Sequence, residues 1–372
     1  MPLRPRPSTV VALTLALAVT APDAAAAAPP APAMSIAGEQ ADLITGAGAV
    51  SALVLTRNGD DVTAAASGVR AQGAPVAARA NDRFRAGSIT KSLLATVVLQ
   101  LADEGSVDLD APLARHLPGV LPYAHDVTVR QLLQHTGGVP DFVDDELLLS
   151  LLEQPDLQWS PQQLASDVAQ LPRLQEQVGR FSYSNSNYLL LGLLVEHLTG
   201  DALDRVMSDR ILRPAGMHHT SFPDDRRIRG THLHGYVPVG PDTQLDVTST
   251  DPSWAWASGD IITTTADLAR FYAKLLSGAL LSPQSLAAMQ STIPTQANPF
   301  EHYGLGLKKW DSPCGDAWGH TGSILGYTTF VASDTSGSKQ VVIAVPFTVE
   351  VAPEHPVTAA FFTSAFTAFC AT

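Results

Sequence analysis

The sequence lacks the features that mark metal-dependent and nucleotide-binding proteins. It contains only two cysteines, no Gly-rich loop able to cradle a phosphate, and no Gly-x-Ser-x-Gly nucleophile elbow. The pairs His218-His219 and His232/His234 lack the carboxylate or cysteine spacing that would complete a metal site. We therefore expect neither a metal nor any other cofactor.

Basic residues are also scarce. Lys and Arg number 23 against 36 Asp and Glu, so the formal net charge is −13. Nucleic acids and anionic membrane surfaces attract basic proteins, and this acidic balance excludes both as expected partners.

The chain also lacks an apolar run long enough to cross a bilayer, which needs roughly 20 residues. Residues 9–20 are apolar, follow Arg4 and Arg6, and precede an alanine-rich segment. This arrangement is typical of a secretory signal. We expect residues 1–28 to be a signal peptide and the mature protein to be secreted, monomeric and without a transmembrane anchor.

The two cysteines fit this expectation. In an exported protein an even pair usually forms a bridge, so we expect Cys314 and Cys370 to be joined and to pin the C-terminal helix to the sheet. On the chain-entropy model, such a bridge stabilises the fold by roughly 4 kcal/mol. Two buried free thiols are the alternative.

Apolar periodicity predicts an α+β fold with an antiparallel sheet flanked by helices. Residues 49–56 and 62–69 alternate apolar with small or polar side chains around Asn58-Gly59-Asp60-Asp61, which indicates a β-hairpin. The closing segments predict strands and a final helix at residues 303–307, 323–332, 340–346 and 357–369.

A long middle segment is helical and punctuated by Pro and Gly. We interpret residues 106–255 as a mostly helical insertion domain, and residues 36–105 and 256–372 as the sheet domain. A functional cleft is expected between the two parts.

Residues Ser88-Ile89-Thr90-Lys91 open an apolar helix and place a hydroxyl and an amine one turn apart on one face. A serine becomes a nucleophile at neutral pH when a proton acceptor lies within reach, and a desolvated lysine can serve. The alternative is an N-capping serine with a solvated lysine. A second match, Ser336 to Lys339, lies in a predicted hairpin turn without a helix to orient it.

A tyrosine and an asparagine form a second candidate motif. Tyr183-Ser184-Asn185 lies in a polar turn before a predicted helix at residues 188–198. The phenol can relay a proton, and the amide can hold a substrate carbonyl or the lysine. The alternative is a turn whose Asn and Ser satisfy backbone groups.

The tripeptide His-Thr-Gly occurs twice. His320-Thr321-Gly322 precedes a predicted strand, where the glycine would let a substrate backbone approach an edge strand. The copy at His135 ends a helix at a glycine pair, which is typical of a structural cap. We assign the active-site role to the later copy.

In this order, Ser-x-x-Lys, Tyr-x-Asn and His-Thr-Gly resemble the motifs of the penicillin-recognising serine hydrolases. The resemblance is to the secreted Streptomyces D-alanyl-D-alanine carboxypeptidases of the class C β-lactamase-like group, and it runs over nearly all of the mature chain. It also includes the cysteine positions and the stretches that begin at Leu101, Val129, Ser253 and Tyr303.

The resemblance implies a role for each matching residue. Ser88 is the acylated nucleophile, and its backbone N–H forms the oxyanion hole with that of Ser323. Lys91 and Tyr183 share general acid and base duty, in an order that their coupled titration leaves open. The implied substrate contacts are Asn185 for the amide, His320 in place of a common lysine, Thr321 and Ser323 for the terminal carboxylate, and Trp254 in the cleft wall.

Two positions depart from these relatives. Lys308 stands where they carry arginine, so a carboxylate would meet a point charge instead of a bidentate fork. Leu147 stands where they carry an aromatic residue, which implies a differently shaped pocket.

The implied function is a serine D-alanyl-D-alanine carboxypeptidase or transpeptidase that acts on peptidoglycan stem peptides through an acyl-enzyme and binds penicillin. A class C-type β-lactamase or small-ester esterase with the same residues is one alternative. A catalytically silent penicillin-binding module is the other.

Overall fold

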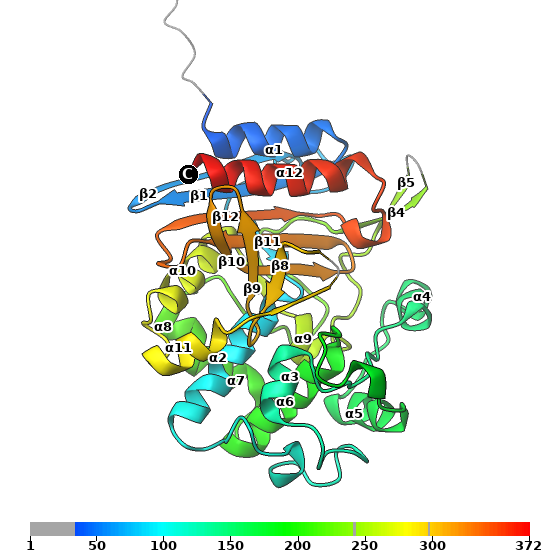
Figure 1. The fold of residues 1–372 in the computed structure, drawn as a ribbon. Helices are drawn as coiled ribbons and strands as arrows, with labels where there is room; N and C mark the ends of the chain where they lie inside the picture. The colour runs from blue at the N-terminus through cyan, green and yellow to red at the C-terminus, as the bar shows by residue number, and fades with distance from the viewer. Residues whose placement is uncertain (1–33, 241–242, 297) are drawn as a thin grey trace, which may run out of the picture. The chain divides into compact units, whose positions relative to one another are not determined.

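The computed structural model describes residues 34–240, 243–296 and 298–372 (Figure 1). The predicted signal peptide lies outside these residues, so its cleavage stays a prediction. Among the described residues, no helix is both long and apolar enough to span a membrane.

Within the described residues, an antiparallel sheet of eight strands forms the centre of the fold, with the order β2-β1-β12-β11-β10-β9-β8-β7. Its strands come from two distant parts of the chain, because β1 pairs with β12 in register from Leu53 opposite Ala344 to Asn58 opposite Lys339. The strands are β1 (Ser51–Asn58), β2 (Asp61–Gly68), β7 (Ile293–Pro294), β8 (Glu301–Tyr303), β9 (Lys308–Ser312), β10 (Gly315–Ile324), β11 (Tyr327–Ser333) and β12 (Lys339–Val345). This confirms the predicted α+β class.

Helices cover both faces of the sheet. Successive strand residues point to opposite sides, and the apolar side chains on each side are buried by a different set of helices. On one face, α1 (Ile36–Gly46) and α12 (Pro356–Ala371) lie side by side and bury Val54, Phe330 and Ile343 (Figure 1). On the other face, α2 (Ile89–Asp103) and α10 (Thr265–Leu276) pack on a core that includes Leu53, Val331 and Val342.

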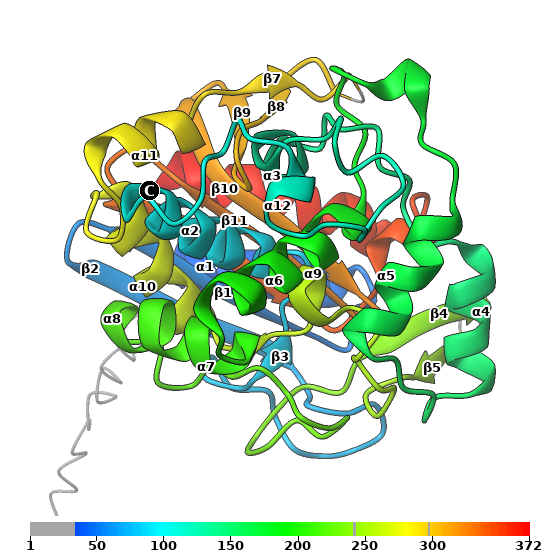
Figure 2. The same ribbon diagram turned by 90° about the horizontal axis from the view of Figure 1, so that it is seen from below.

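The middle of the chain forms the helical layer beside α2 (Figure 2). It contains α3 (Val129–Gln134), α4 (Asp145–Glu153), α5 (Pro161–Gln170), α6 (Asn185–Thr199), α7 (Leu203–Met207) and α8 (Arg213–Ala215). Residues 106–255 also include the hairpin β4 (Tyr236–Gly240) and β5 (Thr243–Asp246). The short α9 (Trp256–Gly259), which follows, packs against α2 and α6. The remaining two-stranded ladder joins β3 (Phe84–Arg85) to β6 (Ile262–Thr263), and α11 (Pro283–Met289) packs near α2.

Two predicted strands differ from the structure. The strand predicted at residues 303–307 is wrong, because residues 304–307 form the turn between β8 and β9. Residues 323–332 are strand as predicted, except that a turn at residues 325–326 divides them between β10 and β11. In both places a glycine with positive φ, Gly306 at +75° and Gly326 at +85°, reverses the chain. Apolar residues continue through these turns because they are buried, so periodicity did not mark them. Helix α1 was not predicted either.

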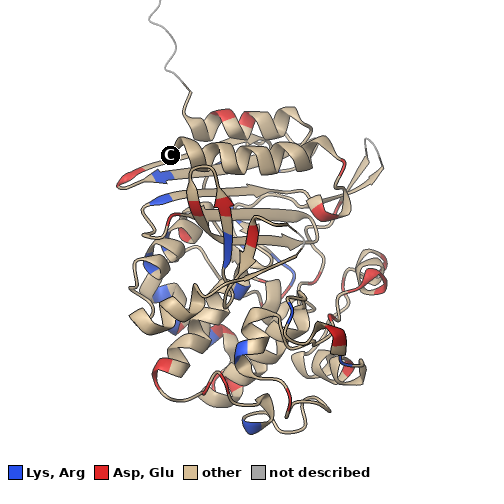
Figure 3. Ribbon diagram, viewed as in Figure 1, with Lys and Arg blue, Asp and Glu red and all other residues tan. Residues whose placement is uncertain are grey.

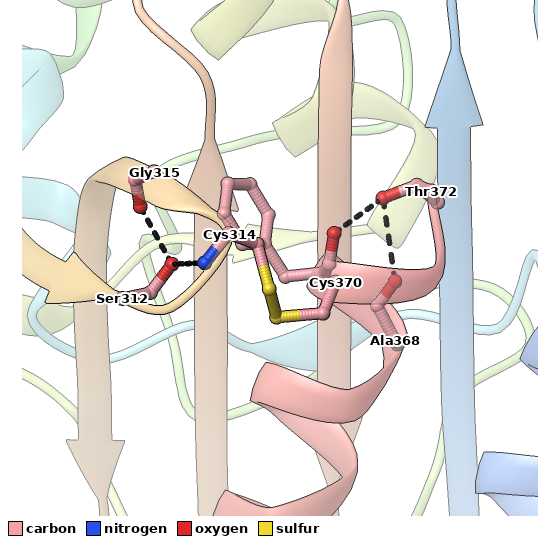
Figure 4. The surroundings of a disulfide bond; sticks show 7 residues. Ser312, Cys314, Gly315, Ala368, Cys370 and Thr372 are labelled. Atoms are coloured by element: carbon pink, nitrogen blue, oxygen red, sulfur yellow. Dashed lines mark hydrogen bonds between the residues drawn. A yellow bond between two sulfur atoms is a disulfide. The ribbon is translucent and has the colours of Figure 1, made fainter.

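A disulfide joins Cys314, in the turn between β9 and β10, to Cys370 in the last turn of α12 (Figure 4). The two Cα atoms lie 5.4 Å apart, across a sequence separation of 56 residues. The bridge therefore links the C-terminal helix to the strand that carries the His320 motif.

Candidate active site

Two glycines bring the start of α2 against β10. A Cβ atom on Gly87, whose φ is +55°, would lie 2.6 Å from the carbonyl oxygen of Ser323, and one on Gly322 would lie 1.9 Å from that of Ala86. No larger residue fits at either position. The backbone before Ser88 therefore lies directly against the end of β10, beside Ser323.

The Ser88 side chain does not cap its helix. Ser88 is the N-cap residue of α2, but its hydroxyl makes no capping bond, and the Lys91 Nζ lies 3.0 Å from its Oγ. Lys91 is fully buried. The alternative interpretation, a capping serine with a solvated lysine, is wrong.

The partners of Lys91 orient its amine toward Ser88. Nζ also lies 2.7 Å from Oδ1 of Asn185 and 2.8 Å from the carbonyl oxygen of Ser258. Both of these oxygens can only accept, so they take two N–H groups. In the neutral amine, the remaining lone pair faces the Ser88 hydroxyl.

An acidic residue fixes this arrangement. The Asn185 Nδ2 and backbone N–H donate to the two carboxylate oxygens of Asp141, at 3.0 and 2.9 Å. This assigns the amide nitrogen to Asp141 and the amide oxygen to Lys91. Burial raises the pKa of Asp141, and the hydrogen bonds from Val143 and Asn185 together with the charge of nearby Lys91 oppose that shift.

Burial lowers the pKa of Lys91 from 10.5 to about 7, while the charges of Asp141 and Glu350 act in the opposite direction. At neutral pH a substantial fraction of the amine is therefore unprotonated and can accept the Ser88 proton. Tyr183 behaves differently. Its pKa is raised well above 10 by burial, with the Ser88 hydroxyl opposing the shift, so the phenol keeps its proton. Lys91 Nζ lies 4.9 Å from the centre of the Tyr183 ring.

The histidines of both His-Thr-Gly copies, His135 and His320, form hydrogen bonds with the hydroxyl of Tyr303. The Nδ1 of His135 accepts from Ser184 N–H at 3.2 Å and from Asn187 Nδ2 at 2.9 Å, so its proton is on Nε2, 3.3 Å from the Tyr303 hydroxyl. At the other end, Nδ1 of His320 donates to the carbonyl of Thr321, so its Nε2 accepts from Tyr303 at 3.0 Å.

This chain of bonds is buried and uncharged. Burial, together with Lys91 and Lys308, lowers the pKa of both histidines well below 6.5. The His135 ring lies 4.4 Å from the Tyr183 ring, with 31° between the planes. His135 is the left-handed C-cap of α3, as predicted, and it also supports the tyrosine of the candidate site.

A cavity of about 330 Å³ opens above Ser88. Its lining unites residues from the sheet, α9 and the helical layer, including Tyr183, Asn185, Trp254, Lys308, Thr321 and Ser323. Among the described residues no hydrogen bond takes up the Ser88 backbone N–H, which leaves it available to an oxyanion.

The structure brings the sequence-predicted site residues to this cavity, with two exceptions. Lys91 is buried directly beneath Ser88, with its Nζ 3.0 Å from the serine Oγ. His320 is also fully buried and does not line the cavity, because its ring is turned toward Tyr303. We therefore correct its assignment from a substrate contact to a support behind Thr321. Leu148 and Val143, not Leu147, line the cavity wall.

Sequence reasoning missed three carboxylates: Asp141, Glu301 and Glu350. Asp141 follows the glycine pair that ends the first His-Thr-Gly segment, and this was its only signal. Glu301 and Glu350 line the cavity. Neither belongs to a motif. Glu301 lies beside Lys308 only because β8 and β9 pair as a hairpin, which the sequence did not predict.

Comparisons with known proteins agree with this geometry. A family model described as Beta-lactamase matches residues 41–366. Penicillin-binding protein 4 of Amycolatopsis lactamdurans is 30% identical over 299 residues, covering 73% of this chain and 74% of that protein. The chain spans 57% of the length of PbpX of Bacillus subtilis (strain 168) and 38% of protein flp of Staphylococcus aureus (strain MW2).

Solved structures of similar fold include amidases. A D-stereospecific amidohydrolase from Streptomyces sp. superposes with a TM-score of 0.78 and 30% identity, covering 88% of this chain and 98% of that one. D-amino acid amidase from Ochrobactrum anthropi SV3 gives a TM-score of 0.77 and 25% identity, covering 91% and 100%. With its family model matched over most of its length, the chain belongs to the Beta-lactamase family of serine hydrolases that includes penicillin-binding proteins and amidases.

Proposed function

We propose that this protein is a secreted serine hydrolase that cleaves the amide bond following a D-amino acid, as a D-alanyl-D-alanine carboxypeptidase or transpeptidase does. The observation that carries the proposal is the buried Lys91 amine, whose Nζ lies 3.0 Å from the Ser88 Oγ and whose pKa is lowered to about 7 by burial. Similarity to a penicillin-binding protein and to a D-stereospecific amidohydrolase supports a D-configured substrate.

In the proposed reaction, neutral Lys91 takes the Ser88 proton as Oγ attacks the substrate carbonyl carbon. The backbone N–H groups of Ser88 and Ser323 stabilise the oxyanion. Tyr183 gives its proton to the leaving nitrogen and recovers one from Lys91, and the amine departs. Water, or an acceptor amine in a transpeptidation, then loses a proton to the Lys91 amine as it attacks the acyl carbonyl carbon. That proton passes to the Ser88 Oγ as the bond between the acyl group and Oγ breaks.

A second candidate function is that of a D-amino acid amidase, which would act on neutral amides. The observation in its favour is the salt bridge of Lys308 with Glu301, at 3.2 Å, which engages the cation expected to meet a substrate carboxylate. A class C-type β-lactamase or small-ester esterase with the same residues is distinguished by its deacylation rate.

The proposal is tested by intact-mass analysis of the mature protein after brief exposure to benzylpenicillin, followed over time. We expect a mass increase of one penicillin that persists, and faster turnover of D-alanyl peptides and D-amino acid amides than of their L-isomers. Rapid loss of the adduct would favour a β-lactamase. No adduct with penicillin, amides or esters would contradict the proposal and favour a silent binding module.

Export is tested separately. When the full chain is expressed with its leader in a secreting host, we expect the protein in the culture medium with an N-terminus that has lost residues 1–28 or close to it. Retention of the intact leader inside the cells would contradict secretion.

A further inference from the structure

The cavity contains one lysine and two carboxylates. Among the described lining residues, Lys308 is the basic one, while Glu301 and Glu350 are acidic. A substrate carboxylate in this cavity would therefore seek Lys308 and meet repulsion from the other two.

Lys308 is already engaged. Its Nζ lies 3.2 Å from both carboxylate oxygens of Glu301, and the indole N–H of Trp310 donates to Oε2 of Glu301 at 2.9 Å. The side chains of Lys308 and Glu301 are only 14% and 17% exposed. Because water and salt screen such a pair less than a surface pair, the attraction is stronger than for an exposed ion pair.

The fold holds this pair in place. Lys308 lies opposite Tyr303, and Glu301 lies opposite Trp310, so the two charges are diagonal neighbours across β8 and β9. Figure 3 shows acidic and basic segments side by side on these two strands. The turn between them is tied to α2, because the Ser92 hydroxyl donates to the carbonyl of Gly306 at 2.7 Å.

We propose that Glu301 determines substrate specificity by forming an ion pair with Lys308, so that this lysine is not free to bind a substrate carboxylate. The cavity then favours substrates that end in a neutral amide or ester over those that end in a carboxylate. A substrate carboxylate must displace Glu301 or share its lysine, and Glu350 adds further repulsion. This inference rests on the proposed function, namely acylation of Ser88 by a peptide cleaved after a D-amino acid. It refines the substrate of that reaction, because the amide form of a D-alanyl-D-alanine peptide becomes a better substrate than the free carboxylate.

The test compares two substrates that differ in one group, N-acetyl-D-alanyl-D-alanine and its C-terminal amide. We expect the wild-type protein to have the higher kcat/KM on the amide. Glu301→Gln keeps an acceptor for Trp310 and releases Lys308, so it should shift the ratio about tenfold toward the carboxylate substrate.

Two variants control for other causes. Asp316→Asn removes the same charge from β10, where Asp316 pairs with Lys309 outside the cavity, and should leave the ratio unchanged. The double variant Glu301→Gln/Lys308→Met should lose the gain. An unchanged ratio in Glu301→Gln, or a gain that persists without Lys308, would overturn the inference.

Penicillin labelling separates this failure from failure of the proposed function. If wild type and Glu301→Gln both form the Ser88 adduct while the substrate ratio stays constant, only the role of Glu301 is refuted. If neither forms an acyl-enzyme with penicillin or with either substrate, the proposed function itself fails.

Discussion

The chain contains the pattern Ser-x-x-Lys in two settings. Ser88 and Lys91 begin a buried helix, and the amine lies 3.0 Å from the hydroxyl. Ser336 and Lys339 lie at the turn between β11 and β12, where the Ser336 hydroxyl donates to Asp334 at 2.6 Å. The Lys339 amine instead lies 4.7 Å from the centre of the Phe369 ring.

The difference between the two copies comes from their surroundings. At the first copy, burial lowers the pKa of Lys91 to about 7, and two fixed acceptors direct its lone pair at the serine. At the second copy, Ser336 is exposed and its hydroxyl donates a hydrogen bond to the carboxylate of Asp334. The same residue types therefore form a nucleophile in one place and a turn in the other.

Replacing the two serines gives the largest expected contrast. Ser88→Ala should abolish the penicillin adduct, because the attacking oxygen is gone, whereas Ser336→Ala should label like wild type. Intact mass measures the adduct, and circular dichroism checks that both variants fold. A labelled Ser88→Ala protein would show that another residue is acylated.

Replacing the two lysines should give the next largest effect. Lys91→Arg puts a permanently charged group in place of the proton acceptor and should slow acylation on the order of a thousandfold. Lys339→Arg should leave the rate within about twofold. Stopped-flow acylation rates provide the measurement, and equal losses in both variants would contradict the assignment of Lys91 as the base.

The pH dependence sharpens the contrast further. Acylation should rise with pH and level off above about 7, because Lys91 must lose its proton before it can act as a base. Asp141 raises the pKa of Lys91, so Asp141→Asn should move this rise to lower pH, with a smaller loss of rate than Lys91→Arg causes. An unchanged pH profile in this variant would refute the coupling between Asp141 and Lys91.

The disulfide should affect stability more than chemistry. Cys314→Ser with Cys370→Ser should lower the free energy of unfolding by up to roughly 4 kcal/mol, because the unfolded chain is no longer cross-linked. The acylation rate should change little, since neither sulfur lies at the cavity. Thermal denaturation with and without a reductant gives the measurement, and an unchanged melting temperature would contradict a stabilising bridge.

Much of the fold could be predicted where local chemistry is unambiguous. The hairpin at Gly59, the α2 helix after Ser88 and the C-terminal helix lie within a few residues of their predicted positions. The differences at residues 303–307 and 323–332 have one cause. Their turns are buried against other elements, so apolar residues occupy them and the usual polar turn signal is absent.

Part of the candidate site could also be predicted from the sequence, because short motifs are local features of the chain. Ser88, Lys91, Tyr183 and Asn185 belong to short motifs, and the structure gathers them at one cavity wall or directly beneath it. Glu301, by contrast, becomes a partner of Lys308 only through the register of β8 and β9. The His-Thr-Gly motif predicts that His320 contacts the substrate, but the sequence does not show that its ring turns toward Tyr303 instead of the cavity.

The sequence by itself determined which residue types could do chemistry and roughly which elements carry them, since motifs and periodicity are local properties of the chain. Only the tertiary structure decided how those groups are protonated, oriented and paired. Desolvation makes Lys91 a base, the bond from Asn185 to Asp141 turns its amide oxygen toward that lysine, and Glu301 engages Lys308. Each of these effects depends on distances between residues far apart in the chain, and such distances exist only after folding.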